Sequence, residues 1–217
     1  MTVERGEETV VHDLAAVVKV HNQTALHELL DDVSTSGMTA PEVRRALIGG
    51  LEEVRKNLMS NDASIPDFLL SLDTVTEGLG RLSRFPGYDR DSVEETTVVI
   101  GVVEGDPHDL GKNVIAGIYR AYGYRVLDLG REVSREAFVK AVVREGAEVL
   151  ALSAMMSTTM VVMHDIIGEI RIKSPGTSVI VGGAPLNDVL ARSYGADGYA
   201  ESALTVLEET DKLIAGS

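Results

Sequence analysis

The sequence contains no cysteine and no tryptophan. The absence of cysteine excludes disulfides, cysteine-ligated zinc, iron–sulfur clusters and thiol nucleophiles. No apolar run reaches the roughly 18 residues that a membrane span needs, so no membrane partner is expected. The start of the chain is acidic and polar, without the basic and apolar segments of a signal peptide. We therefore expect a cytoplasmic protein.

Basic residues are also scarce, with 20 Lys and Arg against 34 Asp and Glu and a formal net charge of -14. Binding to a nucleic-acid duplex needs clustered Lys and Arg, and the sequence shows no such cluster. We therefore expect no nucleic-acid partner. What the chain does have is 44% hydrophobic residues over a length of 217, enough for one large domain or two small ones.

Residues 8–84 have the periodicity of amphipathic helices, with apolar positions recurring every three or four residues, and residues 1–84 form the first predicted domain. Thr39 followed by Glu42 predicts a capping box at one helix start. Ser64 precedes a proline in the first turn of another. The pattern predicts a four-helix bundle, with helices at 9–19, 22–35, 40–59 and 64–83.

The apolar periodicity stops over residues 85–95, which we interpret as a linker. Residues 96–217 alternate short apolar runs with helical stretches. The runs are apolar throughout, which favours a parallel sheet covered on both faces, and five of them suit a doubly wound, flavodoxin-like α/β domain. The predicted strands are 96–103, 124–127, 149–153, 178–181 and a short one near 198–199. The predicted helices are 111–122, 134–145, 158–173, 186–193 and 202–214.

The loop after the first predicted strand carries one histidine among two aspartates, bracketed by Gly105 and Gly111. A histidine that donates one ring nitrogen to a carboxylate, as His108 could to Asp106, is a common arrangement of a metal ligand. A solvated acidic loop with a helix cap explains this pair equally well when it is taken alone.

Two more loops follow predicted strands. Residues 153–160 carry four hydroxyls and no charge, and residues 182–185 begin with paired glycines. Without a ligand, the first of these loops is explained by helix capping by Ser157 or Thr158. The second is explained by an ordinary turn. Because the carboxyl ends of parallel strands meet at one edge, the three loops together predict a groove there. Neither a glycine-rich dinucleotide motif nor a phosphate-binding loop is present, and the paired acids of a receiver domain are missing.

These motifs resemble those of the cobalamin-binding proteins. Asp106, His108 and Gly111 match the Asp-x-His-x-x-Gly signature of that family. The segment from Ser153 to Met155 is similar to its Ser-x-Leu element, with Met155 in place of Leu, and residues 182–183 are similar to its third element. The helical half resembles the family's cap domain. The resemblance covers nearly the whole chain, and it is close to the corrinoid proteins of methyltransferase systems and to the corresponding modules of cobalamin-dependent methionine synthase.

The resemblance implies a role for each matching residue. His108 would be the lower axial ligand of cobalt, Asp106 would accept a hydrogen bond from its ring, and Thr159 would stand where the family has a serine in the same relay. The residues implied to bind the cofactor are Gly105, Asp106, Pro107, His108, Asp109, Gly111, Ser153, Met155, Ser157, Thr159, Gly182, Gly183 and Ser202. In the cap, Leu58, Ile65 and Phe68 match apolar residues that cover the methyl face of the corrinoid, with plain bundle core as their alternative.

The function that the resemblance implies is that of a methyl carrier, with cobalt cycling between Co(I) and methyl-Co(III). A substrate-specific methyltransferase would load the chain, and a second methyltransferase with a tetrahydropterin or thiol acceptor would unload it. A reductive activase would restore oxidised cobalt, and residues 85–95 would be the hinge of the cap. Whether the chain is itself an enzyme stays open.

Three other classes of protein are weighed against the carrier. A cobalamin-dependent light sensor or regulator would be expected to carry a tryptophan in the cap and a DNA-binding module. The small subunit of a carbon-skeleton mutase would be expected to lack the cap. A flavodoxin-like protein that binds no cobalamin is the third alternative.

Overall fold

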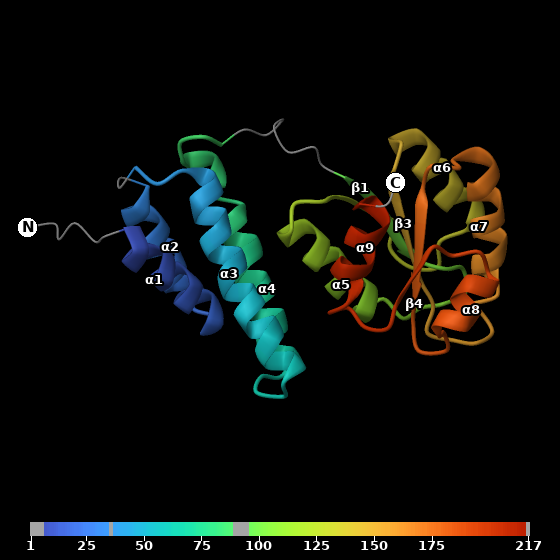
Figure 1. Ribbon diagram of the computed structural model, residues 1–217, viewed down its shortest axis with the longest axis horizontal. Coiled ribbons are helices and arrows are strands. Elements are labelled where there is room, and N and C mark those ends of the chain that lie inside the picture. The colour runs from blue at the N-terminus through green and yellow to red at the C-terminus, as the bar shows by residue number, and fades with distance from the viewer. Residues whose placement is uncertain (1–6, 35–36, 89–95, 216–217) are drawn as a thin grey trace, which may run out of the picture. The chain divides into compact units, whose positions relative to one another are not determined.

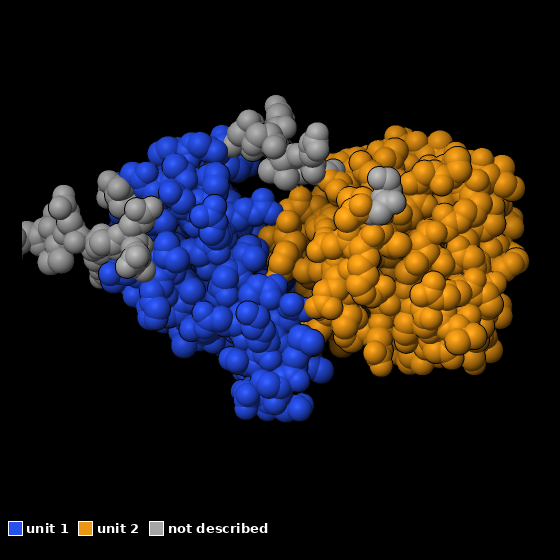
Figure 2. All heavy atoms as spheres, in the orientation of Figure 1, with its two compact units in different colours: residues 1–94 blue, residues 95–217 orange. Residues whose placement is uncertain are grey.

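The structure, a computed structural model, describes residues 7–34, 37–88 and 96–215. The chain divides into two compact units, residues 1–94 and residues 95–217 (Figure 2). The first is helical and the second combines a parallel sheet with helices (Figure 1). This is the fold class that the sequence predicts.

The helical unit begins its helices where the sequence places capping signals. At the start of α3, the Thr39 amide and hydroxyl both donate to Glu42 Oε2 at 2.7 Å. At the start of α4, the Ser64 amide and hydroxyl donate to Asp67 at 2.8 and 2.6 Å. Both capping boxes therefore satisfy donors that a helix start leaves free. The helical elements of this unit are α1 (Glu7–Lys19), α2 (Gln23–Val33), α3 (Ala40–Met59), α4 (Ile65–Leu79) and the short 3-10 helix η1 (Leu82–Arg84).

The helices of this unit bury their apolar stripes. Helices α1 and α3 approach so closely that a Cβ on Gly50 would lie 2.7 Å from the carbonyl oxygen of Ala15. Glycine is therefore required at this crossing, because any side chain would push the two backbones apart. The fully buried side chains of the unit include Leu14, Val18, Leu26, Val43, Leu47, Leu51 and Val75.

The predicted linker does not begin where the sequence places it. Phe85 is 4% exposed, and the carbonyl of Pro86 accepts a hydrogen bond from the Ala40 amide at 2.8 Å. Both residues thus belong to the helical unit. Residues 89–95 of the predicted linker lie outside the described residues, as does the last residue of the predicted helix 22–35.

The second unit has one parallel sheet with strand order β2-β1-β3-β4-β5. Helices α5 and α9 cover one face, and α6, α7 and α8 cover the other (Figure 1). The strands β1, β3 and β4 are buried along most of their length, which explains why these runs are mostly apolar, whereas the edge strand β2 is partly exposed. The strands are β1 (Thr97–Val102), β2 (Arg125–Asp128), β3 (Val149–Ser153), β4 (Ser178–Gly182) and β5 (Gly198–Ala200). The helices are α5 (Leu110–Ala121), α6 (Arg135–Glu145), α7 (Val162–Lys173), α8 (Asp188–Ser193) and α9 (Val206–Ala215).

Two helices begin one turn later than the sequence predicts. Residues 156–161 form turns, with the Thr159 and Met160 amides both donating to the Met156 carbonyl, so α7 starts at Val162. The alternative interpretation, that Ser157 or Thr158 caps this helix, is wrong, because the N-cap residue of α7 is Val161. Residues 202–205 form a similar turn before α9. With these bounds, no helix within the described ranges is long and apolar enough to cross a membrane.

Candidate functional site

Asp106 lies at the centre of the loop after β1, and its side chain is fully buried, with 0% exposure. Its Oδ1 accepts hydrogen bonds from ring Nδ1 of His108 at 2.8 Å and from the His108 amide at 3.1 Å. Its Oδ2 accepts from the Met155 amide at 2.7 Å, the Met156 amide at 3.1 Å and the Thr159 hydroxyl at 2.9 Å. One side chain thus joins the loop after β1 to the loop after β3.

These contacts keep Asp106 ionised at neutral pH. Burial raises the pKa of the carboxyl, but the hydrogen bonds donated by Met155, His108 and Thr159 outweigh it and lower the pKa from 3.8 to about 2. An ionised carboxylate only accepts hydrogen bonds, so Nδ1 of His108 must carry the proton of the neutral ring. The lone pair of the imidazole is therefore on Nε2.

The His108 side chain is 57% exposed, and its oriented imidazole has the form of a metal ligand supported by a carboxylate. Within residues 7–34, 37–88 and 96–215, no group of three or more His, Cys, Asp or Glu side chains could hold a metal ion. A metal bound at His108 must therefore bring most of its own ligands, as the metal of a macrocyclic cofactor does. The single imidazole fits a corrinoid, a cofactor whose ring would hold its own metal.

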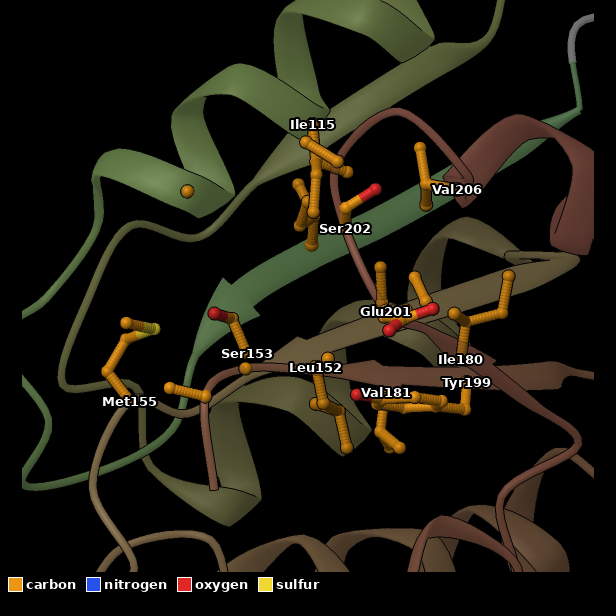
Figure 3. Close-up of a pocket in the computed structure, with 18 residues that line it drawn as sticks. Ile115, Leu152, Ser153, Met155, Ile180, Val181, Tyr199, Glu201, Ser202 and Val206 are labelled. Carbon is orange, nitrogen blue, oxygen red and sulfur yellow. The ribbon is translucent and has the colours of Figure 1, made fainter. Parts of the chain in front are cut away.

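An apolar groove of about 360 Å³ lies at the carboxyl edge of the sheet. Figure 3 shows Ile115 and Val206 on the helix side and Leu152, Ile180 and Val181 on the strand side. A largely apolar lining with few polar groups is typical of a cofactor site. Predicted cofactor residues that line the groove are Gly111, Ser153, Met155, Gly182, Gly183 and Ser202.

The paired glycines have a structural reason beside any ligand. Gly183 has φ +134°, and a Cβ there would lie 1.7 Å from the carbonyl oxygen of Ala154. A Cβ on Gly182 would lie 3.2 Å from the carbonyl oxygen of Ala200. The Ala154 amide also donates to the Gly182 carbonyl at 3.1 Å. Glycine at 183 is thus required by the close approach of the loops after β3 and β4, which together form one end of the groove.

The remaining predicted residues of the second unit are spread around this centre. Pro107 is exposed, and Asp109 is the N-cap residue of α5. Gly105 has φ +80°, a conformation that glycine adopts without strain. Ser157 is exposed and is not among the residues that line the groove. Its contact with a cofactor stays a prediction.

The three predicted cap residues differ in exposure. Ile65, the first residue of α4, is 64% exposed, Leu58 near the end of α3 is partly buried, and Phe68 is only 2% exposed. Ile65 can therefore meet a ligand without rearrangement, whereas Phe68 cannot. The role of all three toward a cofactor stays a prediction.

Sequence reasoning missed several backbone contacts and residues of the site. The Met155 and Met156 amides, which hold Asp106, are backbone groups and carry no sequence signal. The groove-lining residues of the strands, such as Leu152, resemble ordinary core. Lys112 is buried and forms an ion pair with Asp128. Its signal in the sequence was a lysine in the first turn of a helix, next to the histidine loop.

The fold and the site define a class of protein: a flavodoxin-like domain with one exposed imidazole, held by a buried carboxylate, beside an apolar groove. Residues 96–208 match the B12 binding domain family. A corrinoid protein of Desulfitobacterium hafniense strain Y51 is 33% identical over 215 residues, covering 96% of this chain and 92% of the relative. The trimethylamine corrinoid protein of Methanosarcina barkeri is 30% identical over 203 residues, covering 91% and 92%.

Solved structures agree with these relatives. A chain in the crystal structure of the methanol:cobalamin methyltransferase complex MtaBC from Methanosarcina barkeri superposes with a TM-score of 0.84 at 26% identity, covering 100% of this chain and 86% of that chain. A cobalamin-binding protein from Desulfitobacterium hafniense DCB-2 shares the fold, with a TM-score of 0.76 at 22% identity. The chain belongs to the corrinoid proteins that carry a B12-binding domain, and its cofactor is a corrinoid, as the sequence predicts.

Proposed function

We propose that this chain is the methyl carrier of a methyltransferase system. The observation that carries the proposal is His108, whose Nε2 lone pair faces outward while a buried carboxylate holds Nδ1. The names of the relatives support it, since they include dimethylamine and trimethylamine corrinoid proteins. When bound, a corrinoid supplies a cobalt centre that can accept and release a methyl group.

The residues of this chain would hold and tune that centre. His108 would hold the cobalt through Nε2, and the groove lined by Ser153, Gly182 and Ser202 would hold the nucleotide tail of the cofactor. Asp106 keeps the proton on Nδ1 of His108.

Besides the proton on Nδ1 of His108, the site has a second proton, that of the Thr159 hydroxyl. Its single hydroxyl proton has two acceptors, Asp106 Oδ2 at 2.9 Å and the Met156 carbonyl at 3.0 Å. The hydroxyl can therefore strengthen or release its bond to the carboxylate without moving the backbone. In this proposal Thr159 does what the serine of the family does, because both residues offer one donor.

The partners and location belong to the proposal as well. A substrate-specific methyltransferase would load the chain, a tetrahydropterin or thiol methyltransferase would unload it, and a reductive activase would restore it. The structural match to a chain of a methanol methyltransferase complex supports a partner of the first kind. Residues 1–84 would act as the cap, with Leu58 and Ile65 toward the cofactor, and the protein would be cytoplasmic. The light-sensor alternative finds no support in these relatives.

The test uses the full chain purified without corrinoid. Titration with cobalamin should show saturable binding at one cofactor per chain. The loaded and reduced chain, mixed with a methylamine or methanol methyltransferase and its radiolabelled substrate, should retain one labelled methyl group per chain after gel filtration. A chain that binds cobalamin but retains no label with any of these donor systems would contradict the carrier role, and a chain that does not bind cobalamin would contradict the whole proposal.

A further inference from the structure

Lys112 lies in the first turn of α5, four residues after His108, and its side chain is only 3% exposed. Its Nζ donates to both carboxylate oxygens of Asp128 at 2.7 Å. A lysine in the first turn of a helix is opposed by the helix dipole, and burial of an ammonium group costs free energy. Something other than helix propensity therefore accounts for a lysine at this place.

Asp128 is the last residue of β2, and its side chain is 22% exposed. Its Oδ1 also accepts a hydrogen bond from the Gly130 amide at 2.9 Å, which fixes the carboxylate against its own loop. The Leu129 amide donates to the Ile100 carbonyl of β1 at 2.8 Å, so this end of β2 is held firmly to the sheet. The Asp128 carboxylate that binds Lys112 is thus held in a fixed position.

One contact of Asp106 and one of Lys112 join the histidine segment to the two strands that neighbour β1. Strand β1 lies between β2 and β3. Asp106, two residues before His108, bonds to the loop after β3. Lys112, four residues after it, bonds to the end of β2. The segment that carries His108 is therefore tied to both neighbours of β1, once on each side.

An ion pair of this kind does little for net stability, because desolvation offsets much of its Coulomb energy, and apolar replacements are often equally stable. Its geometric effect is larger, since Nζ is held between two oxygens and cannot shift without leaving a buried charge unpaired. We propose that the Lys112–Asp128 ion pair is a positioning device that fixes the start of α5 and thereby the imidazole of His108. We call the Lys112–Asp128 pair the tether. Its effect on His108 as a metal ligand rests on the proposed function, whereas its effect on the start of α5 does not.

The test compares two variants with a matched control in the full chain. Lys112→Met keeps the aliphatic length and removes the charge. Asp128→Asn keeps the shape and an acceptor for the Gly130 amide, and it serves if Lys112→Met does not fold. The control is Arg125→Met, which breaks the pair of Arg125 with Glu145 at the other end of β2, where the two NH–O distances are 3.0 Å.

The first readout needs no cofactor. Hydrogen exchange of the His108 amide, which donates to Asp106, should be at least tenfold faster in Lys112→Met, with a smaller increase in Asp128→Asn and none in Arg125→Met. The second readout is nitrogen coupling from His108 in the electron paramagnetic resonance spectrum of the chain loaded with cobalamin in the Co(II) state. The ratio of coordinated to free imidazole should fall at least tenfold in Lys112→Met while cobalamin still binds.

Unchanged exchange at His108 in both variants would overturn the tether. A uniform increase across the second unit, shared by Arg125→Met, would also overturn it, because the pair would then be only one more contribution to stability. Faster exchange at His108 with unchanged nitrogen coupling would overturn the link to the ligand. If the wild-type chain bound no cobalamin, the proposed function would fail, and the exchange rates would still decide the tether.

Discussion

Asp106→Asn tests the electrostatic centre of the site, because it keeps the shape and replaces one acceptor oxygen by an NH2 donor. The wild-type carboxylate accepts five hydrogen bonds. The single amide oxygen of asparagine satisfies most donors when it faces the Met155 and Met156 amides and the Thr159 hydroxyl. The NH2 group then faces His108, whose Nδ1 must accept, so the ring proton moves to Nε2.

The size of the effect follows from the hydrogen bonds. A carboxyl pKa lowered from 3.8 to about 2 means that the fold favours the ionised form by about 2.5 kcal/mol. Asparagine cannot ionise and loses this contribution. This figure already includes the hydrogen bond from the His108 amide, which loses its acceptor in the variant. We expect Asp106→Asn to lower the free energy of unfolding of the second unit by about 2–4 kcal/mol at pH 7.

The pH dependence has a definite sign. Because folding lowers the pKa of Asp106, the stability it contributes is present above about pH 4, the unfolded value, and is lost as the pH falls toward 2. The difference between wild type and Asp106→Asn should therefore shrink over that range. Urea unfolding of the chain without cofactor at pH 7 and near pH 3 measures the difference. Imidazole nitrogen shifts of His108 in nuclear magnetic resonance report the tautomer. Equal stability at pH 7, with the proton still on Nδ1, would refute the reasoning.

Three further predictions concern single side chains. Thr159→Val removes one donor to the buried carboxylate and should cost about 1–3 kcal/mol in urea unfolding, while Thr159→Ser should cost less than half as much; equal losses would contradict this. Gly183→Ala should cost more than about 2 kcal/mol, because its Cβ would meet the Ala154 carbonyl, while Gly176→Ala, with nothing within 4 Å, should change little. Burial raises the pKa of Tyr119 to about 12, so stability should be complete below pH 10 and fall as the pH rises to 12. Tyr119→Phe should reduce this alkaline loss, and an equal loss in both proteins would show that another group causes it.

Much of the architecture could be predicted from local patterns. Uniformly apolar runs such as residues 149–153 indicate a sheet buried on both faces, and capping pairs such as Thr39 and Glu42 mark helix starts. Aspartate and histidine two residues apart suggested a pair, and the structure shows the 2.8 Å contact. These features were predictable because the partners are close in sequence or because one physical period dominates.

Features that depend on distant partners were not predictable in the same way. The ion pair of Lys112 with Asp128 joins a helix start to a strand end sixteen residues later. The late start of α7 depends on turns around Thr159, whose hydroxyl bonds to a carboxylate in another loop. In the same way, Gly183 matches a family motif, but glycine is required there because a side chain would meet the backbone of Ala154.

The central claim is that His108 holds the metal of the cofactor through Nε2. The most direct measurement is the electron paramagnetic resonance spectrum of the full chain loaded with cobalamin in the Co(II) state, in which every histidine carries ¹⁵N. The account predicts coupling from one ¹⁵N nucleus in the wild type and none in His108→Gly, which should still bind cobalamin in the groove. Coupling that persists in His108→Gly, or a wild type without ¹⁵N coupling, would contradict the assignment.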